Sequence, residues 1–483
     1  MNFTEFSFWW LLVLSIVPLL SVRFLGKRLK FWQDDYDRIG LMLLSLMLFY
    51  NASSKSFIIF AFEIIFNYAM VWLMLRRRGG EAQVIAVVVI AIDVAILAYF
   101  KYLNFFLEDL LGLAVRGVGG NWGGDVAIPG VRAIPPGLSF YTFEMVAFVV
   151  DSLRSKDKKP IGFIDYINFV SFFPHVVAGP IERRSKLFPQ MAKFRFKFSV
   201  ENFEVGFRWL ALGLFMKLVL GDNLTQYIDY QETANAWLVW LSIYLFTLRI
   251  YFDFAGYSFM AVGIAKAMGV ELTINFLAPY TALSIQEFWR RWHITLNNWF
   301  RDYVFLPLMG TKKQWAAFYL FITFTLSGFW HGASWNFVLW GAYHGFLLLL
   351  LRYTGRFLGQ RLLMPDFVSW AVTFWSVMFG CLFFIETNIS RLGIKLQTLA
   401  NPLAYSLSNI NNAISSFSVN QLGALGFTLI LANVVLFLEH LAVWQKRESE
   451  YELLLLPWVA RVLLGLTILF AANEPSQFIY FDF

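Results

Sequence analysis

Apolar runs of about 20 residues recur along almost the whole chain, and this repetition is its most constraining feature. A run of that length crosses the hydrocarbon core of a bilayer as a helix. Lipid offers no partner to an unpaired backbone group, so a membrane-spanning segment must be a helix or part of a closed barrel. Because 59% of the 483 residues are hydrophobic and the mean hydropathy is +0.60, we predict an all-α polytopic membrane protein.

The positions of the basic residues predict how the apolar runs are oriented across the membrane. Lys and Arg gather in short loops beside them, and this bias toward the cytoplasm accounts for most of the net charge of +7 without any nucleic-acid partner. About twelve crossings are expected, within a range of eleven to thirteen, and both termini are expected outside. The expected spans lie near 7–25, 39–52, 56–75, 83–107, 135–154, 204–221, 236–256, 314–331, 333–352, 367–387, 421–443 and 455–472. The first is expected to be a retained anchor, because its basic residues follow it.

Three segments depart from this pattern. Residues 161–180 are apolar but interrupted by Pro and Gly and flanked by basic residues, so they are expected to be re-entrant or interfacial. The Gly-rich stretch 117–125 and the Asn/Ser-rich stretch 400–420 are expected to be outside loops. No soluble domain or internal repeat is evident, so residues 1–483 are predicted to form one membrane domain, with a catalytic segment at about 240–350.

The segment SIQEFWRRWHITLNNWFRDY contains His293 and predicts one amphipathic helix lying in the membrane interface. Its aromatic residues fall on one side and its charged and amide residues on the other, with His293 at the boundary. Glu287 and Arg291 are spaced to form an ion pair. Arg290 and Arg291 are expected either to anchor lipid head groups or to attract the phosphates of a cytoplasmic nucleotide-bearing donor. From the pattern alone, the favoured role of His293 is a hydrogen bond to a neighbour in the interface.

The segment LSGFWHGASWNFVLWGAYHG places His331 at a short turn between two apolar helices. Gly332 is predicted to end the first helix in the left-handed conformation, and Ser334 to cap the second. An ionisable residue at membrane depth is a functional candidate by default. Burial favours the neutral imidazole, which can accept a proton as a general base. The alternative is a core histidine bonded to a carbonyl, the role we expect for His175, His344 and His440.

The sequence predicts no metal site and no tightly bound cofactor. His331 and His293 lie 38 residues apart, and neither belongs to an HExxH motif. Asp253 and Glu386 lie within apolar runs, and these carboxylates are the candidates for additional metal ligands beside the histidines. The single cysteine, Cys381, is expected to be a small buried hydrophobe.

Long motifs in this region resemble the membrane-bound O-acyltransferase family, most closely its bacterial branch that acetylates alginate and other exopolysaccharides. The similarity covers roughly residues 80–350 and the C-terminal tail. It rests on these strings: NFVSFFPHVVAGPIERRSKLFPQM, YFDFAGYSFMAVGIAKAMG, NFLAPYTALSIQEFWRRWHITLNNWFRDYVFLPLMG, GFWHGASWNFVLWGAYHG and QFIYFDF. The chain departs from the family pattern at Phe259 and at Asn297-Asn298. The resemblance implies a ring of tilted helices around a central tunnel.

The resemblance also implies a function. His331 corresponds to the family's catalytic histidine and His293 to its second signature histidine, while Arg290, Arg291, Trp330 and Asn336 are expected to bind substrate. The implied reaction moves an acetyl group from a cytoplasmic thioester, acetyl-CoA, across the bacterial cytoplasmic (inner) membrane. Implied partners are membrane lipid, an extracytoplasmic polysaccharide-acetylating protein and the polysaccharide synthesis machinery. Two alternatives are D-alanyl transfer to teichoic acid and transport of polysaccharide or lipid without acyl chemistry.

Overall fold

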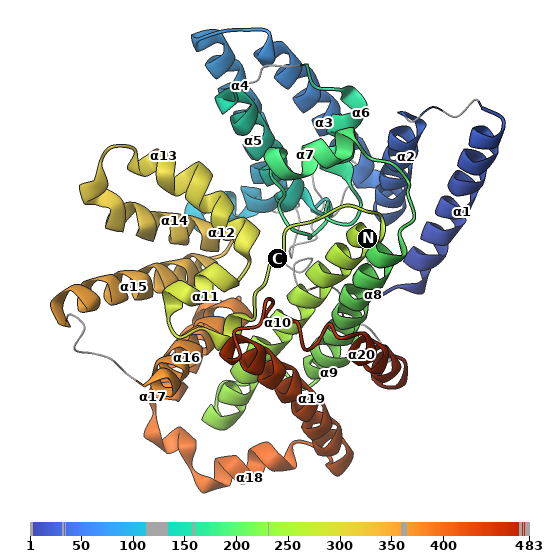
Figure 1. Ribbon diagram of the computed structural model, residues 1–483. Coiled ribbons are helices and arrows are strands. Elements are labelled where there is room, and N and C mark those ends of the chain that lie inside the picture. The colour runs from blue at the N-terminus through green and yellow to red at the C-terminus, as the bar shows by residue number, and fades with distance from the viewer. Residues whose placement is uncertain are drawn as a thin grey trace. The chain divides into compact units, whose positions relative to one another are not determined.

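A computed structural model describes residues 3–30, 33, 35–112, 134–156, 160–229, 231–358, 365–472, 476 and 478. Every regular element in these residues is a helix, which confirms the all-α prediction (Figure 1). The Gly-rich stretch 117–125 and most of the QFIYFDF tail lie outside the described residues. The chain forms two compact units, residues 1–210 with 260–273 and residues 211–259 with 274–483.

Seven helices among the described residues are long and apolar enough to cross a membrane, so the protein is a multi-pass membrane protein. They are α1 (Phe6–Arg28), α3 (Ser54–Leu75), α4 (Gly80–Asn104, continued by the π-helical turn Phe105–Leu110), α10 (Ala236–Ala267), α15 (Trp335–Leu358), α16 (Asp366–Ile385) and α19 (Val419–Trp444). The other five expected crossings fall on helices that are shorter or richer in charge. These are α2 (Asp35–Ala52), α5 (Leu138–Arg154), α8 (Val200–Leu214), α14 (Ala316–His331) and α20 (Pro457–Phe470).

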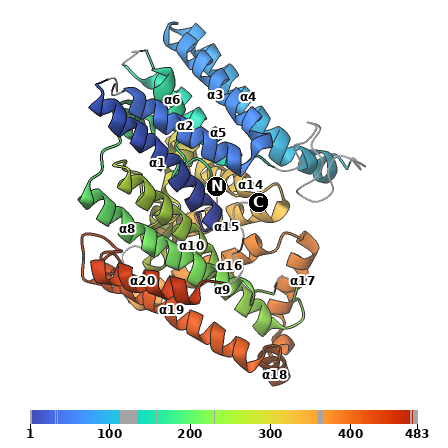
Figure 2. The same ribbon diagram turned by 90° about the vertical axis from the view of Figure 1, so that its right-hand side faces the viewer.

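In the first unit, α3 and α4 run side by side (Figures 1 and 2). Asn67 on α3 donates a 2.8 Å hydrogen bond to Asp93 on α4, and both side chains are fully buried. The segment expected to be re-entrant contains only the nine-residue α6 (Phe163–Ser171), which at 1.5 Å per residue is too short to span a bilayer. Beyond α6 the chain is irregular yet buried, and His175 Nδ1 lies 3.6 Å from Glu144 Oε2.

In the second unit, α14 and α15 form a closely packed helical hairpin that carries His331 at its turn. Glycines permit the close approach, because a Cβ atom on Gly341 would overlap the carbonyl oxygen of Phe324 and lie 2.9 Å from Thr325 Cα. Small residues at such crossings let helix backbones meet in a membrane.

Replacing Gly341 by Ala should therefore force the two helices apart and destabilise the protein by about 1–3 kcal/mol, a typical cost of overpacking. Thermal unfolding of the detergent-solubilised protein measures the effect. Gly393→Ala is the control, because no atom lies within 4 Å of a Cβ built there. Equal melting temperatures for the two variants would contradict this account of the hairpin.

A buried ionic cluster lies where α8 continues into a π-helical turn, Phe215–Gly221, followed by α9 (Asp222–Thr225). Lys217 Nζ lies 2.6 Å from Asp222 Oδ1 and 2.6 Å from Asp253 Oδ1, and all three side chains are about 1% exposed. Ser476 donates a 2.6 Å hydrogen bond to Asp222, so the cluster also fixes the position of Ser476.

The expected loop at 400–420 contains helical structure. The preceding α17 (Ile389–Ala400) leads into a short 3-10 turn and then into α18 (Leu407–Ser415). Within the stretch, the side chains of Asn401 and Ser406 accept hydrogen bonds from the first-turn backbone of the 3-10 turn and of α18, respectively. Polar residues that suggest a loop in the sequence therefore serve here as helix caps.

Candidate active site

His293 interrupts the helix expected around it. The structure has two short helices, α11 (Ile285–Arg291) and α12 (Ile294–Phe300), so the prediction of one continuous helix is wrong. His293 lies between them in the left-handed conformation, with φ +40° and ψ +54°. This conformation is strained for a residue with a Cβ atom, at a cost of about 1–3 kcal/mol, and such strain is typical of functional positions.

The break at His293 is held by hydrogen bonds to a segment about 20 residues earlier. Ile294 donates to the Asn275 carbonyl at 2.9 Å, and Leu277 donates to the Arg291 carbonyl at 3.0 Å. The Asn275 side chain accepts from the Thr295 hydroxyl at 2.7 Å. These bonds replace helical ones on both sides of His293, so the kink is fixed by a distant part of the chain.

His331 is the last residue of α14, as predicted, but Gly332 is extended (φ −162°, ψ 150°) rather than left-handed. The glycine is needed for space, because a Cβ atom there would overlap the ring of Phe337. Ser334 occupies the predicted position before α15, and its hydroxyl donates to the Thr387 carbonyl at 3.5 Å.

Aromatic rings enclose the His331 side chain, which is 3% exposed. The ring centroids of Trp330, Trp340 and Phe384 lie 5.0, 5.1 and 5.3 Å from that of His331. Such packing fixes the orientation of the imidazole and excludes water from most of its surface.

One cavity of about 570 Å³ brings His331 and His293 together. Its volume lies within the range of small-molecule sites. Polar residues line it beside the two histidines: Gln286, Arg290, Asn297, Asn298, Arg301, Thr323 and Ser327. On its other side, His331 borders a void of only about 20 Å³ that it shares with His344, enough for roughly one water molecule. His331 is therefore accessible from a large cavity on one side and closely packed on the other.

The four expected substrate-binding residues do not all line this cavity. Arg290 does, whereas Arg291 pairs with Glu287 at 2.9 Å and Glu450 at 3.4 Å. The predicted Glu287–Arg291 ion pair is thus present.

The other two expected residues are buried away from the cavity lining. The Trp330 ring lies near both histidines, with its centroid 5.0 Å from that of His331 and 6.3 Å from that of His293. Asn336 is fully buried and donates to the Phe383 carbonyl at 2.9 Å, which is a packing role.

The difference between the two arginines predicts opposite effects of their substitution. Arg290→Ala should raise the KM for an anionic acyl donor by about tenfold without lowering the melting temperature, because it removes a positive charge from the cavity lining. Arg291→Ala should lower the melting temperature and leave the KM nearly unchanged in the folded fraction. Donor titration of both purified variants measures the two effects, and the reverse outcome would contradict the assignment.

Sequence reasoning missed several residues of this site. Asn297 donates to the Trp289 carbonyl at 2.6 Å and lines the cavity together with Asn298 and Arg301. Their polar character was visible in the sequence, but the helix break that turns them toward His293 was not.

Phe478, near the C-terminus, also lies in the surroundings of His293. Phe478 stacks on Tyr257 with centroids 4.7 Å apart and contacts Phe254 at 5.6 Å. Phe254 in turn packs edge-on against His293 at 4.6 Å. Burial among these rings lowers the pKa of His293 to about 3, so His293 is neutral at physiological pH and can donate or accept one hydrogen bond.

No group of three metal-binding side chains occurs among the described residues. The two carboxylates that could have served as further metal ligands are both in ion pairs. Asp253 pairs with Lys217, and Glu386 pairs with Arg391 at 3.0 Å and with Lys395 at 2.8 Å. Cys381 is buried and makes no disulfide.

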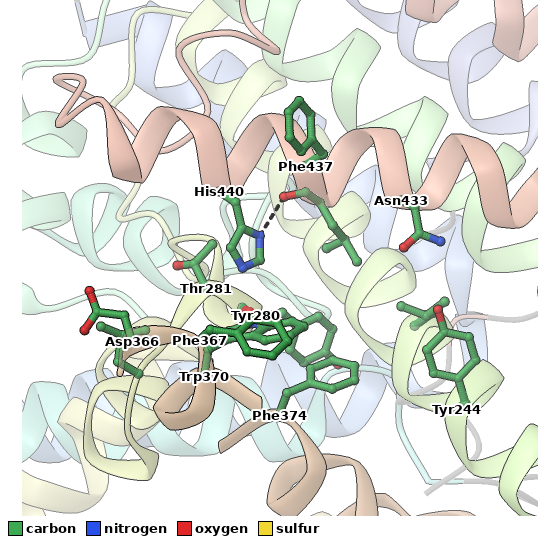
Figure 3. Close-up of a pocket in the computed structure, with 13 residues that line it drawn as sticks. Tyr244, Tyr280, Thr281, Asp366, Phe367, Trp370, Phe374, Asn433, Phe437 and His440 are labelled. Carbon is green, nitrogen blue, oxygen red and sulfur yellow. Dashed lines mark hydrogen bonds between the residues drawn. The ribbon is translucent and has the colours of Figure 1, made fainter. Parts of the chain in front are cut away.

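A second cavity, of about 610 Å³, lies between α10, α16 and α19 and contains neither signature histidine (Figure 3). Tyr280, Trp370 and Phe374 form an aromatic wall, and Trp370 donates to the Tyr280 carbonyl at 2.8 Å. His440 points toward this cavity, with Nδ1 2.9 Å from the Leu436 carbonyl. Its lining includes Asp366 but neither lysine nor arginine, in contrast to the cavity that contains Arg290.

Comparison with known proteins identifies the family to which the chain belongs. The family model of the membrane-bound O-acyltransferases matches residues 3–392. The chain is 33% identical to the "probable alginate O-acetylase AlgI" of Pseudomonas aeruginosa, over 86% of this chain and 78% of that protein. It is 29% identical to the peptidoglycan O-acetyltransferase of Helicobacter pylori, over 97% of this chain and 96% of that protein. Identity to the teichoic acid D-alanyltransferase of Bacillus subtilis is 28%, over 50% of this chain and 67% of that protein. The chain belongs to the membrane-bound O-acyltransferase family and is an acyltransferase.

Proposed function

We propose that the protein transfers an acetyl group from acetyl-CoA on the cytoplasmic side of the inner membrane toward an exopolysaccharide such as alginate on the outer side. The cavity that joins His331, His293 and Arg290 is the observation that carries the proposal. The similarity to proteins named for alginate and peptidoglycan O-acetylation supports acetyl as the cargo.

His331 is the general base in this proposal. It takes the proton of an attacking hydroxyl as the hydroxyl oxygen bonds to the thioester carbonyl carbon. The carbon–sulfur bond then breaks, and the proton passes from the imidazolium to the departing thiolate. A neutral imidazole held in an apolar setting suits both proton transfers.

The surrounding residues orient the two substrates. Arg290 presents its guanidinium group at the cavity, and the planar donors of that group match phosphate oxygens. Arg301 also lines the cavity, but it pairs with Asp302 at 2.7 Å. His293, neutral and fixed by its strained backbone, is placed to hydrogen-bond the acceptor or the developing oxyanion. The acceptor is a serine of an extracytoplasmic partner or the polymer itself.

D-alanyl transfer to teichoic acid is the second candidate, supported by the similarity to the B. subtilis protein. Membership of an acyltransferase family displaces the transporter hypothesis. Mass spectrometry of envelope polymers from a deletion strain separates the two acyl groups. Loss of acetyl esters supports the proposal, whereas loss of D-alanyl esters with acetyl esters intact would overturn it.

A further inference from the structure

A third cavity, of about 350 Å³, lies in the first unit and contains neither signature histidine. Its walls come from α1, α8, the end of α10 and the segment 196–198. On α1 the lining residues are Trp9, Leu12, Ile16 and Leu20, whose spacing places them on one helix face. The cavity is therefore an apolar groove beside a membrane-spanning helix.

One charged residue, Lys197, lines this groove, and no acidic residue does. Lys197 is exposed and forms no ion pair with any residue in the described part of the chain. It belongs to the sequence KFRFKF (193–198), in which basic residues alternate with phenylalanines after α7 (Arg184–Ala192) has ended. Phe196 and Phe198 flank Lys197 and also line the groove, and Phe198 is 72% exposed.

Apolar walls with cations at the edge match the two parts of an anionic lipid. Aromatic and basic residues in one short segment are typical of the membrane interface, where rings enter the acyl region and cations meet phosphates. The positive charge of the segment 183–197 also places it on the cytoplasmic side, whose leaflet is negatively charged. A zwitterionic head group would leave Lys197 without a net counter-charge.

We infer that this groove binds one acyl chain of an anionic glycerophospholipid, with the lipid phosphate on Lys197. Lys193 and Arg195 add positive charge along the same segment. The site would select lipids by head-group charge, and its occupancy does not depend on the acetyl-transfer reaction.

Native mass spectrometry of the full chain, released from nanodiscs of equal phosphatidylglycerol and phosphatidylethanolamine, tests the inference. The wild type should retain phosphatidylglycerol in excess over phosphatidylethanolamine. Lys197→Gln should reduce that excess about fivefold, the effect of one lysine near an anionic surface. Ile16→Trp, which fills the groove without changing charge, should abolish retention. Lys312→Gln, an exposed lysine outside the groove, should leave it unchanged.

Three results would overturn the inference: equal retention of both lipids by the wild type, an unchanged excess in Lys197→Gln, or unchanged retention in Ile16→Trp. Circular dichroism and melting temperature of each variant verify that it is folded, so that a loss of lipid reports on the groove. Acetyl-transfer activity is not used as a readout, so failure here would leave the proposed function standing.

Discussion

His331→Ala should lower polymer O-acetylation by about 10²–10⁴-fold, the usual contribution of a general base. The side chain is lost from a cavity wall, and the helix that carries it keeps its glycine-mediated packing against α15. The variant should therefore accumulate in the membrane at wild-type levels. Ester content of polymer from complemented deletion cells, normalised to membrane abundance of the protein, measures the effect.

His440→Ala is the matched control for that experiment. His440 also sits near the end of an apolar helix, but it bonds its own helix backbone and lies in the cavity without signature histidines. It should retain nearly full acetylation. Equal losses in the two variants would mean that any helix-end histidine matters in the same way, against a specific role for His331.

Lys217→Met should destabilise the protein by about 3–5 kcal/mol, because it leaves Asp222 and Asp253 buried without their shared cation. Near-complete loss from the membrane fraction at growth temperature is the expected phenotype. Immunoblotting of membranes and thermal unfolding in detergent measure it. Combining Lys217→Met with Asp222→Asn and Asp253→Asn should recover part of the stability, since the uncompensated charges are removed.

Lys266→Met provides a contrast within the same protein. Lys266 pairs with Glu271 at 2.8 Å, but the two side chains are 26% and 74% exposed. An exposed pair contributes only about 0–1 kcal/mol. If Lys217→Met melted like Lys266→Met, the shared cation of the ionic cluster would not stabilise the fold as described.

Hydropathy predicted most of the fold, because membrane-spanning helices depend on local composition. The expected spans at 7–25, 56–75 and 367–387 agree with the observed helices within a few residues. The stretch 400–420 was less predictable, since the same Asn and Ser residues suit either a loop or a helix cap.

The sequence predicted the two histidines of the site, but it did not predict the backbone geometry and the hydrogen bonds around them. His331 could be placed at a helix end because the apolar runs on both sides are long. The break at His293 could not be predicted, because the hydrogen bonds that hold it come from Asn275. Helical periodicity depends on neighbouring residues and does not reveal such distant partners. Arg290 and Arg291 are adjacent on α11, yet Arg290 lines the cavity, whereas Arg291 pairs with Glu450.

The most direct test of the central claim is acetyl release by the purified protein in nanodiscs, followed with acetyl-CoA labelled in the acetyl group. The account predicts transfer or slow hydrolysis by the wild type, a rate at least about a hundredfold lower for His331→Ala, and a raised KM for Arg290→Ala. Wild-type rates in His331→Ala, with the label still consumed, would show that another group accepts the proton and would contradict the account.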